Sequence, residues 1–484
     1  MGHKHTVLAG YRNTVTAATL ILGCALAQGG VVSLDSCRQM ALANNKALRI
    51  ADENIRGAGY LKKAAFAAYL PGIDFNGTYI HNQHQIELLG ADAKLPTMSF
   101  DPTTMSYTPN ILVGPNGTPV TDPKTGSLIP TEVAVIPKEA MAYDTRNVFA
   151  GAFTLTQPVY MGGTIRAMNQ ITKYAEKMAQ SLRNSTLQDV IFSVDEAYWM
   201  VVSLREKEKL ARSYANLVDS LRYNVGEMLK EGVATRSDLL SVEVKYNEAC
   251  IALTKVENGL SLSRMNLAQI CGLPVDSNPE PAEEGKDMLP EAAPDYTLSE
   301  VVASRPDLDA VRQSISVLEH REKLSMGAML PKIAAVGAWS FSNPNVIHGF
   351  EKRFGGGFSV GATLSIPIWH WGGNYNKYRA AKSNTAATRL MLEDLEEKVD
   401  LQLSQAKYKL AEAAKTLEMT DNNLKSAQAN LENAQYGFKE GVLTADDVMA
   451  AQTAWLLANS ENIDARIGLR LCNTYLAKVA GKLY

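Results

Sequence analysis

The same unit occurs twice in this chain. The segment GVATRSDLL starts at Gly232 and GVLTADDVM starts at Gly441, 209 residues later, and Lys-Glu precedes both. Each segment leads into a stretch of helical character that ends at a glycine, Gly272 in the first copy and Gly481 in the second. Solenoid repeats are roughly 20–50 residues long, so this period is too long for a solenoid. The pattern predicts a duplicated, domain-sized unit.

Within each copy, the expected order is helix, strand, strand, long helix, long helix. The first repeat should span 28–290, with a helix at 34–69, strands at 72–80 and 148–159 on either side of a long loop at 81–147, and a helical hairpin at 163–272. The second repeat should span 291–484, with a helix at 298–330, strands at 332–342 and 358–368, and a helical hairpin at 373–481.

The N-terminal residues 1–27 have the pattern of a signal peptide. Lys4 and Arg12 precede an apolar stretch at 14–26, and Ala25-Leu26-Ala27 fits a cleavage site. Cleavage before Cys24, followed by lipid attachment, is the alternative. No later stretch approaches the roughly 18 apolar residues of a transmembrane helix, so we expect any membrane span to be a β-barrel.

Composition excludes two classes of protein. The chain is 46% hydrophobic and 20% charged, which excludes a disordered chain. Its formal net charge is -3 and it has no run of basic residues, so we expect no nucleic-acid partner.

Strict alternation marks the clearest strand. The apolar residues of this strand should face lipid, and they are Phe358, Val360, Ala362, Leu364 and Ile366. Small residues lie between them, and of these Thr363 should face the lumen. A soluble two-sheet sandwich, in which the apolar faces form the core, is the alternative. Four strands cannot close a barrel, because about eight are needed, so the open edges require partner chains.

The connection between the first two strands is the longest expected loop. Eight of the 19 prolines lie between Tyr79 and Val148, which predicts a surface loop. His81 and His84 are three residues apart in extended chain, so we expect an incidental pair and no metal. Residues 355–357, all glycine, should end the second loop. The chain has no Walker or H-E-x-x-H motif, so we expect neither an enzyme nor a cofactor.

The second copy carries an unbroken 3.5-residue repeat of large and small residues. Its members are Leu403, Ala406, Leu410, Ala413, Leu417, Thr420, Leu424, Ala427, Leu431, Ala434 and Phe438. Five heptads of this spacing predict a supercoiled helix. In the first copy no proline interrupts 163–273, and the rising helix of about 65 residues would be roughly 100 Å long.

The chain resembles the TolC-like outer-membrane efflux proteins. The resemblance rests on the duplicated order, on the strand exits QPVYMGG and IPIWHWGG, and on the text FKEGVLTADDVMAAQ from Phe438 to Gln452. It implies an α+β membrane protein of long coiled-coil helices and β-hairpins. It also implies a homotrimer with one barrel of about 12 strands, continued by an α-helical barrel in the periplasm.

The resemblance implies a passive exit duct in the outer membrane for a tripartite efflux or type I secretion system. Its partners would be outer-membrane lipid, a periplasmic adaptor (membrane fusion) protein and an inner-membrane transporter. The alternative is a secreted coiled-coil scaffold or adhesion protein with a small β-domain.

The candidate functional residues lie at the turns of the two helical hairpins. The resemblance implies a ring of acidic side chains that narrows the pore, with Asp447 in the second copy and Asp238 as its counterpart. The position of a second aspartate in some family members is Ala450 here, and Asp446 is the neighbouring acidic residue. Capping of the return helices by Asp238 and Asp447 is the alternative. The predicted adaptor-contacting residues are Gly232, Val233, Gly441, Val442 and Leu443.

Overall fold

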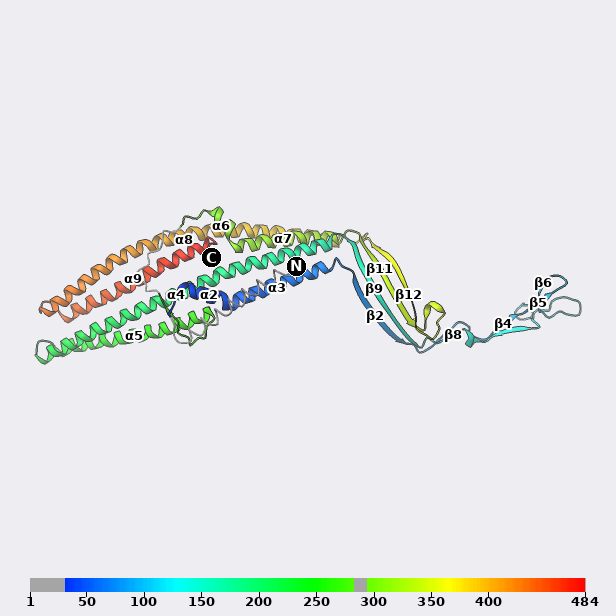
Figure 1. The fold of residues 1–484 in the computed structure, drawn as a ribbon, viewed down its shortest axis with the longest axis horizontal. Coiled ribbons are helices and arrows are strands. Elements are labelled where there is room, and N and C mark those ends of the chain that lie inside the picture. Colours follow the sequence, from blue (N-terminus) through cyan, green and yellow to red (C-terminus); the bar gives the residue numbers. More distant parts are fainter. Residues whose placement is uncertain (1–30, 283–293, 484) are drawn as a thin grey trace, which may run out of the picture. The chain divides into compact units, whose positions relative to one another are not determined.

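The chain forms two compact units, each built from separate stretches of sequence (Figure 1). The computed structural model describes residues 31–282 and 294–483, so the predicted signal peptide, Cys24 and the predicted boundary at 290 lie outside the described residues. The helical unit comprises the described residues up to 65, together with 166–325 and those from 375 onward. The sheet unit comprises 66–165 and 326–374.

Within the described part of the helical unit, each copy contributes four helices. The first copy has α2 (Leu34–Asn44), α3 (Lys46–Ala67), α4 (Thr164–Lys230) and α5 (Arg236–Cys271). The second has α6 (Leu298–Ser304), α7 (Pro306–Gly327), α8 (Gly373–Lys439) and α9 (Ala445–Val479). A short parallel pair joins β1 (Val31–Val32) to β10 (Glu280–Pro281). None of the described helices has an apolar stretch long enough to cross a membrane.

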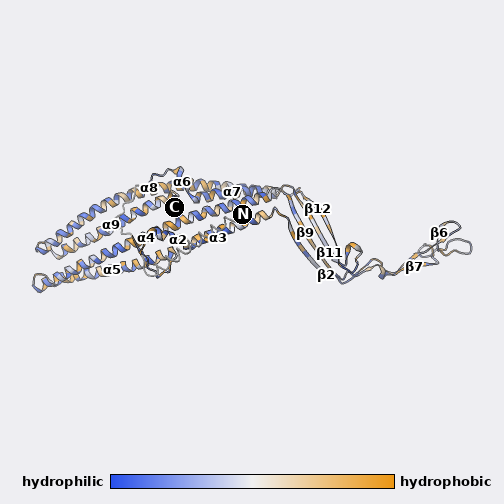
Figure 2. Cartoon of the chain, viewed as in Figure 1, coloured by the Kyte–Doolittle hydropathy of each residue, from blue (hydrophilic) through white to orange (hydrophobic). Residues whose placement is uncertain are grey.

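The predicted stripe of α8 packs inward. All eleven of its residues are buried or half-buried, with Leu403, Ala406 and Leu431 among the most buried. Polar and apolar residues alternate along the full length of the long helices (Figure 2). Helices α4 and α8 have 67 residues each, which corresponds to roughly 100 Å at about 1.5 Å per residue. Only lateral packing of these stripes buries enough apolar surface to hold such long helices.

The predicted helices 34–69 and 298–330 are each broken in two. The backbone of Asn45 is extended at the first break, and its side-chain amide (Nδ2) donates to the Ile270 carbonyl at 3.2 Å. Arg305 is extended at the second break because Pro306 follows it, and it donates to the Val479 carbonyl at 3.3 Å. In both copies, therefore, the break caps the C-terminal end of the return helix.

Glycine is required where each return helix meets this break. Gly272 has a φ of +72°, and a Cβ placed there would lie 2.6 Å from the Cβ of Asn44. Gly481 has a φ of +70°, and its Cβ would lie 3.0 Å from the backbone of Ser304. The positive φ and the close approach together explain why both copies carry glycine here.

The sheet unit contains one four-stranded antiparallel sheet. Its strands are β2 (Gly72–His81), β9 (Asn147–Met161), β11 (Lys332–Asn343) and β12 (Gly355–Ser365), in the order β12-β11-β9-β2. Each copy therefore supplies two strands, and β2 and β12 are the edges. The prediction that residues 355–357 end the loop is wrong, because they lie within β12 and pair with β11. Glycine is needed there, since a Cβ on Gly356 would lie 2.6 Å from the Ser340 carbonyl oxygen.

The predicted loop 81–147 contains short paired strands. The pairs are β3 (Ile86–Glu87) with β8 (Ala142–Tyr143), β4 (Ala93–Pro96) with β7 (Val133–Ile136), and β5 (Met98–Asp101) with β6 (Ser106–Pro109). Helix η1 (Lys138–Met141) lies between β7 and β8. Prolines are compatible with these ribbons because each strand has a free edge, where a missing N–H costs little.

One face of the four-stranded sheet is apolar across all four strands. Phe75, Phe153, Trp339 and Phe358 lie directly opposite one another in register, and the ring centroids of Phe75 and Phe153 are 4.8 Å apart. The next row on this face contains Ile73, Leu155, Gly337 and Val360. These large side chains are exposed, up to 82% for Phe358. The predicted sandwich would have buried them, so their exposure argues against that alternative.

Candidate functional site

The two helical hairpins turn in the same way. In the first, the Val233 N–H donates to the Met228 carbonyl at 2.9 Å, and Gly232 has a φ of +78°. In the second, the Val442 N–H donates to the Gly437 carbonyl at 2.8 Å, and Gly441 has a φ of +73°. A left-handed residue after the last helical turn satisfies the carbonyls at the helix end. The glycines of the repeated motif thus serve the turn geometry.

Asp238 and Asp447 begin the return helices with reciprocal caps. Oδ2 of Asp447 accepts the Thr444 backbone N–H at 2.9 Å and the Thr444 hydroxyl at 2.7 Å. The Asp447 N–H donates to that hydroxyl oxygen at 3.3 Å. Oδ2 of Asp238 accepts the Thr235 N–H at 2.8 Å, and the Asp238 N–H donates to the Thr235 hydroxyl at 3.2 Å. Capping, the predicted alternative role, is therefore present in both copies.

These caps keep both carboxylates ionised. The hydroxyl and backbone N–H of Thr444 lower the pKa of Asp447. The backbone N–H and hydroxyl of Thr235 lower the pKa of Asp238 in the same way. Each site therefore retains a fixed negative charge at neutral pH, on an exposed surface.

The apolar residues of the two turns differ in exposure. Val233 and Val442 are well exposed, whereas Leu443 is more covered. Leu443 lies against α8, where a Cβ on Gly437 would come within 2.8 Å of its Cδ1. Valine thus presents the apolar surface of each turn, and Leu443 anchors the second turn to its helix.

A shared core lies behind the two turns. It joins residues of α4, α5, α8 and α9, and its buried members include Val225, Val242, Leu431 and Val448. Gln452 is also buried, and it donates to the Leu217 carbonyl at 3.5 Å. Both hairpins therefore end in one packed cluster, which fixes their tips side by side within the helical unit.

The stability of the second turn should depend on pH through Asp447. Because the folded-state pKa is lowered, the cap contributes stability above the unfolded pKa, about 3.9, and loses it as pH falls through the folded-state value. We expect Asp447→Ala to speed hydrogen exchange in residues 440–452 at pH 7, with a smaller difference below about pH 4. Asp446→Ala, which removes the adjacent carboxylate, is the matched control. Equal exchange in Asp447→Ala and the wild type at pH 7 would contradict the capping role.

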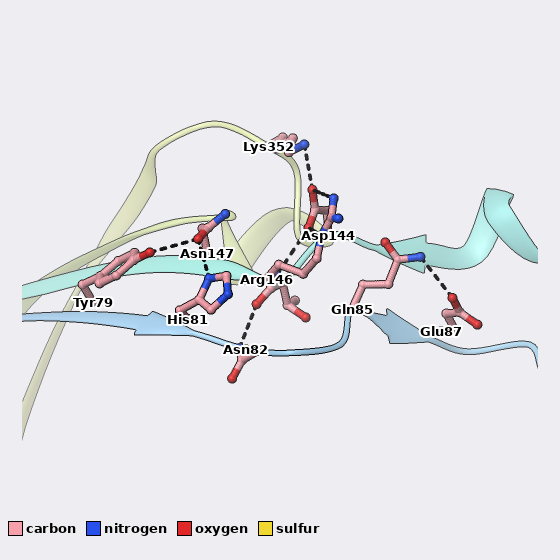
Figure 3. A network of polar contacts seen from close by, with 10 residues as sticks. Tyr79, His81, Asn82, Gln85, Glu87, Asp144, Arg146, Asn147 and Lys352 are labelled. Atoms are coloured by element: carbon pink, nitrogen blue, oxygen red, sulfur yellow. Dashed lines mark hydrogen bonds and ion pairs between the residues drawn. The ribbon is translucent and has the colours of Figure 1, made fainter.

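A cluster of polar side chains lies at the end of the sheet that carries the strand connections (Figure 3). We call it the clasp, and it consists of Tyr79, His81, Asp144, Arg146, Asn147 and Lys352. Asp144 binds Arg146, with Nε–Oδ1 at 2.8 Å, and binds Lys352, with Nζ–Oδ2 at 2.8 Å. Oδ1 of Asn147 accepts the Tyr79 hydroxyl at 3.0 Å and lies 2.9 Å from Nδ1 of His81. The clasp joins the first-copy strands to the β11–β12 connection. Its charges were not singled out in the sequence because Lys352 is more than 200 residues from Asp144.

The predicted incidental histidine pair belongs partly to this clasp. His81 contacts Asn147, and the described residues contain no group of three or more His, Cys, Asp or Glu side chains arranged to hold a metal. No evidence for a metal centre therefore comes from the described part of the chain.

The helical unit also contains a buried ion pair that the sequence patterns did not predict. Arg38 of α2 makes a bidentate contact with Asp195 of α4, with Nε–Oδ1 at 2.7 Å and Nη2–Oδ2 at 2.6 Å. The Asp195 side chain is fully buried in a cluster with Val194 and Tyr198. Burial raises the pKa of Asp195, and the bonds from Arg38 oppose that rise. One available signal was the placement of an acidic residue within the apolar run VIFSVDEAYWMVV.

Known proteins share both sequence and fold with this chain. Residues 297–482 match the family described as outer membrane efflux protein. The outer membrane efflux protein BepC of Brucella suis biovar 1 (strain 1330) is 24% identical over 351 residues, which cover 71% of this chain and 74% of BepC.

Solved structures show the same fold at lower identity. The Campylobacter jejuni CmeC outer membrane channel superposes with a TM-score of 0.72 at 15% identity, covering 93% of this chain and 86% of that chain. The open state of the Neisseria gonorrhoeae MtrE outer membrane channel gives a TM-score of 0.70 at 16% identity, covering 93% and 89%. Both matches span the helical hairpins and the sheet.

Proposed function

Since the chain belongs to the TolC-like outer membrane efflux protein family and lies in the outer membrane with a helical part in the periplasm, we propose that it is the passive exit duct of a tripartite efflux or type I secretion system. An inner-membrane transporter would supply the energy, and a periplasmic adaptor would join the two. The observation that carries the proposal is the exposed apolar face of the four-stranded sheet.

The apolar face of the four-stranded sheet is suited to contact with lipid, and the opposite face, with its small and polar residues, is suited to contact with water. Val360 is 81% exposed on the apolar face, while its neighbours Ser359 and Gly361 belong to the opposite face. On β2 the same alternation places Phe75 on the apolar face and Asp74 and Asn76 on the other. A barrel wall needs this arrangement, apolar outside and polar or small inside. We assign Phe358, Val360, Ala362 and Leu364 to the lipid surface, with Ile366 directly beyond the end of β12.

We take three copies to close the barrel, the number that the resemblance to the family implies. The edges β2 and β12 each present unpaired backbone groups, which lipid cannot satisfy. Pairing of β2 in one protomer with β12 in the next satisfies both edges and gives a homotrimeric barrel of about 12 strands. The long helices would extend this barrel as a helical tunnel.

The hairpin turns would form the gate and the adaptor contact. Threefold symmetry would bring three Asp447 carboxylates around one axis, where fixed negative charge attracts cations. Asp238 and Asp446 would add charge nearby. The exposed valines Val233 and Val442, with Gly232, Gly441 and Leu443 shaping the turns, would offer the adaptor an apolar surface.

Bilayer recording of the purified protein tests this function. We expect cation-selective channels in the wild type and weaker cation selectivity in Asp447→Asn, because the ring would lose its charge. Asp238→Asn should have a smaller effect.

The cation selectivity of the wild type should also depend on pH. Since the caps lower the pKa of Asp447, wild-type selectivity should persist on acidification until below about pH 4. Unaltered selectivity in Asp447→Asn would remove the gate role, and the absence of any channel would refute the duct.

A further inference from the structure

The connection between β11 and β12 folds over the polar face of the sheet. We call this connection, residues 344–354, the strap, and it contains the short helix η2 (Val346–His348). Gly357 shares the polar face with its register partner Ser340, and a Cβ on Gly357 would lie 3.3 Å from Cδ1 of Ile347. The Val346 N–H donates to the Ser342 hydroxyl, on the same face, at 3.3 Å. The strap therefore covers the face opposite to the aromatic row.

Specific contacts hold the strap in this position. Asn345 is buried and accepts the Ile347 N–H at 3.0 Å. A Cβ on Gly355 would lie 1.9 Å from Nδ2 of Asn345, so only glycine leaves room for this amide. At the far end, Lys352 binds Asp144 of the clasp (Figure 3), and Phe350 packs on Tyr143 with ring centroids 5.1 Å apart. The strap is thus fixed at both ends.

The strap places aliphatic side chains over a part of the sheet that carries mostly small and polar residues. Val346 is 57% exposed and Ile347 is 53% exposed. Together with Asn76, Thr78 and Ser340 they line a cavity of about 340 Å³ between the strap and the sheet. Val346 and Ile347 therefore form a small exposed apolar patch beside this cavity.

We propose that Val346 and Ile347 form a hydrophobic constriction at the loop end of the pore. The proposal rests on the proposed function, in which the polar face lines the lumen of a trimeric barrel. Three straps would then project six aliphatic side chains toward the axis. A narrow apolar ring disfavours water and therefore ions, so it restricts passage without any charge. This constriction would select among solutes by size and polarity, separately from the acidic ring at the helical turns.

Disulfide trapping tests the position of the strap in the assembled protein. Ile347→Cys combined with Gly357→Cys should form a disulfide on oxidation in isolated outer membranes, because the Ile347 side chain reaches Gly357: a Cβ there would lie 3.3 Å from Cδ1 of Ile347. Ile347→Cys combined with Phe358→Cys is the matched control, since Phe358 lies on the other face. Equal or greater cross-linking in the control pair would overturn the placement.

Single-channel recording tests the constriction itself. Val346→Ser combined with Ile347→Ser should raise the current, and Ile347→Trp should lower it, each by roughly twofold or more. Leu128→Ser removes an exposed aliphatic residue of the 81–147 insertion and should leave the current unchanged. Unchanged current in both strap variants would overturn the constriction while leaving the duct intact. Absence of channels in the wild type would instead refute the duct, and the constriction with it.

Discussion

Arginine at Val360 should block assembly of the protein in the outer membrane. Val360 lies in the middle of β12 on the exposed apolar face, opposite Gly337 of β11. A charged residue facing the centre of the bilayer destabilises a barrel by about 2–4 kcal/mol, less near the interfaces. We expect Val360→Arg to reduce the amount of heat-modifiable protein in the outer-membrane fraction severely, as measured by gel migration of boiled and unboiled samples.

The neighbouring residue provides the control for this prediction. Ser359 lies on the same strand with its side chain on the opposite face, paired with Ala338. Ser359→Arg should assemble nearly as well as the wild type because its charge would face the aqueous lumen. Equal tolerance of arginine at both positions would mean that the sheet does not contact lipid.

Removal of Arg38 should destabilise the helical unit strongly. Arg38→Met would leave the Asp195 carboxylate buried without its bidentate partner. Loss of one partner of a buried pair costs about 3–5 kcal/mol, and the partial exposure of Arg38 favours the lower end. Urea unfolding of the detergent-purified protein, followed by circular dichroism, measures this difference in the free energy of unfolding.

The loss in Arg38→Met should also depend on pH. Burial raises the pKa of Asp195 above its unfolded value. A carboxyl whose pKa is raised in the folded state does not destabilise the fold below its unfolded pKa, about 3.9. The loss of stability grows as pH rises from that value and is complete above the folded-state pKa. The variant should therefore approach wild-type stability at low pH. Asp35→Ala removes the exposed partner of Arg38 and should cost less than about 1 kcal/mol. A similar loss in both variants would contradict the buried-pair account.

The sequence predicts the long elements well because one periodic pattern governs each of them. The 3.5-residue stripe from Leu403 to Phe438 is sufficient to predict α8, since every stripe position packs inward. Strict alternation from Phe358 likewise predicts most of β12 and the residues that share its faces. Such patterns are local, so a single chain segment contains the whole signal.

Features that depend on contacts between distant segments are harder to predict. The breaks at Asn45 and Arg305 are stabilised by carbonyls of Ile270 and Val479, which are more than 150 residues away in sequence. Residues 355–357 read as loop because glycine disfavours strands, yet the close approach of Ser340 requires glycine there. The prolines of residues 81–147 similarly predict a loop, although short paired strands form there.

The candidate site was predicted in part. The repeated motif places Asp238 and Asp447 at the turns, and the structure adds that Thr235 and Thr444 cap them reciprocally. The spacing Thr-x-x-Asp already contains this cap, as a short relative of the usual capping box. The clasp and the strap could not be predicted, because both depend on how the two strand connections fold against each other.

Disulfide formation between the sheet edges tests the trimeric duct most directly. A cysteine at Asn76 of β2 would be combined in turn with Ser359→Cys, Gly361→Cys and Thr363→Cys of β12, since all four positions lie on the polar face. We predict that one of these pairs gives a covalent trimer on oxidation in the outer membrane, while each single variant gives only monomer on a denaturing gel. A monodisperse folded monomer in mild detergent, with no disulfide between chains in any pair, would contradict the account.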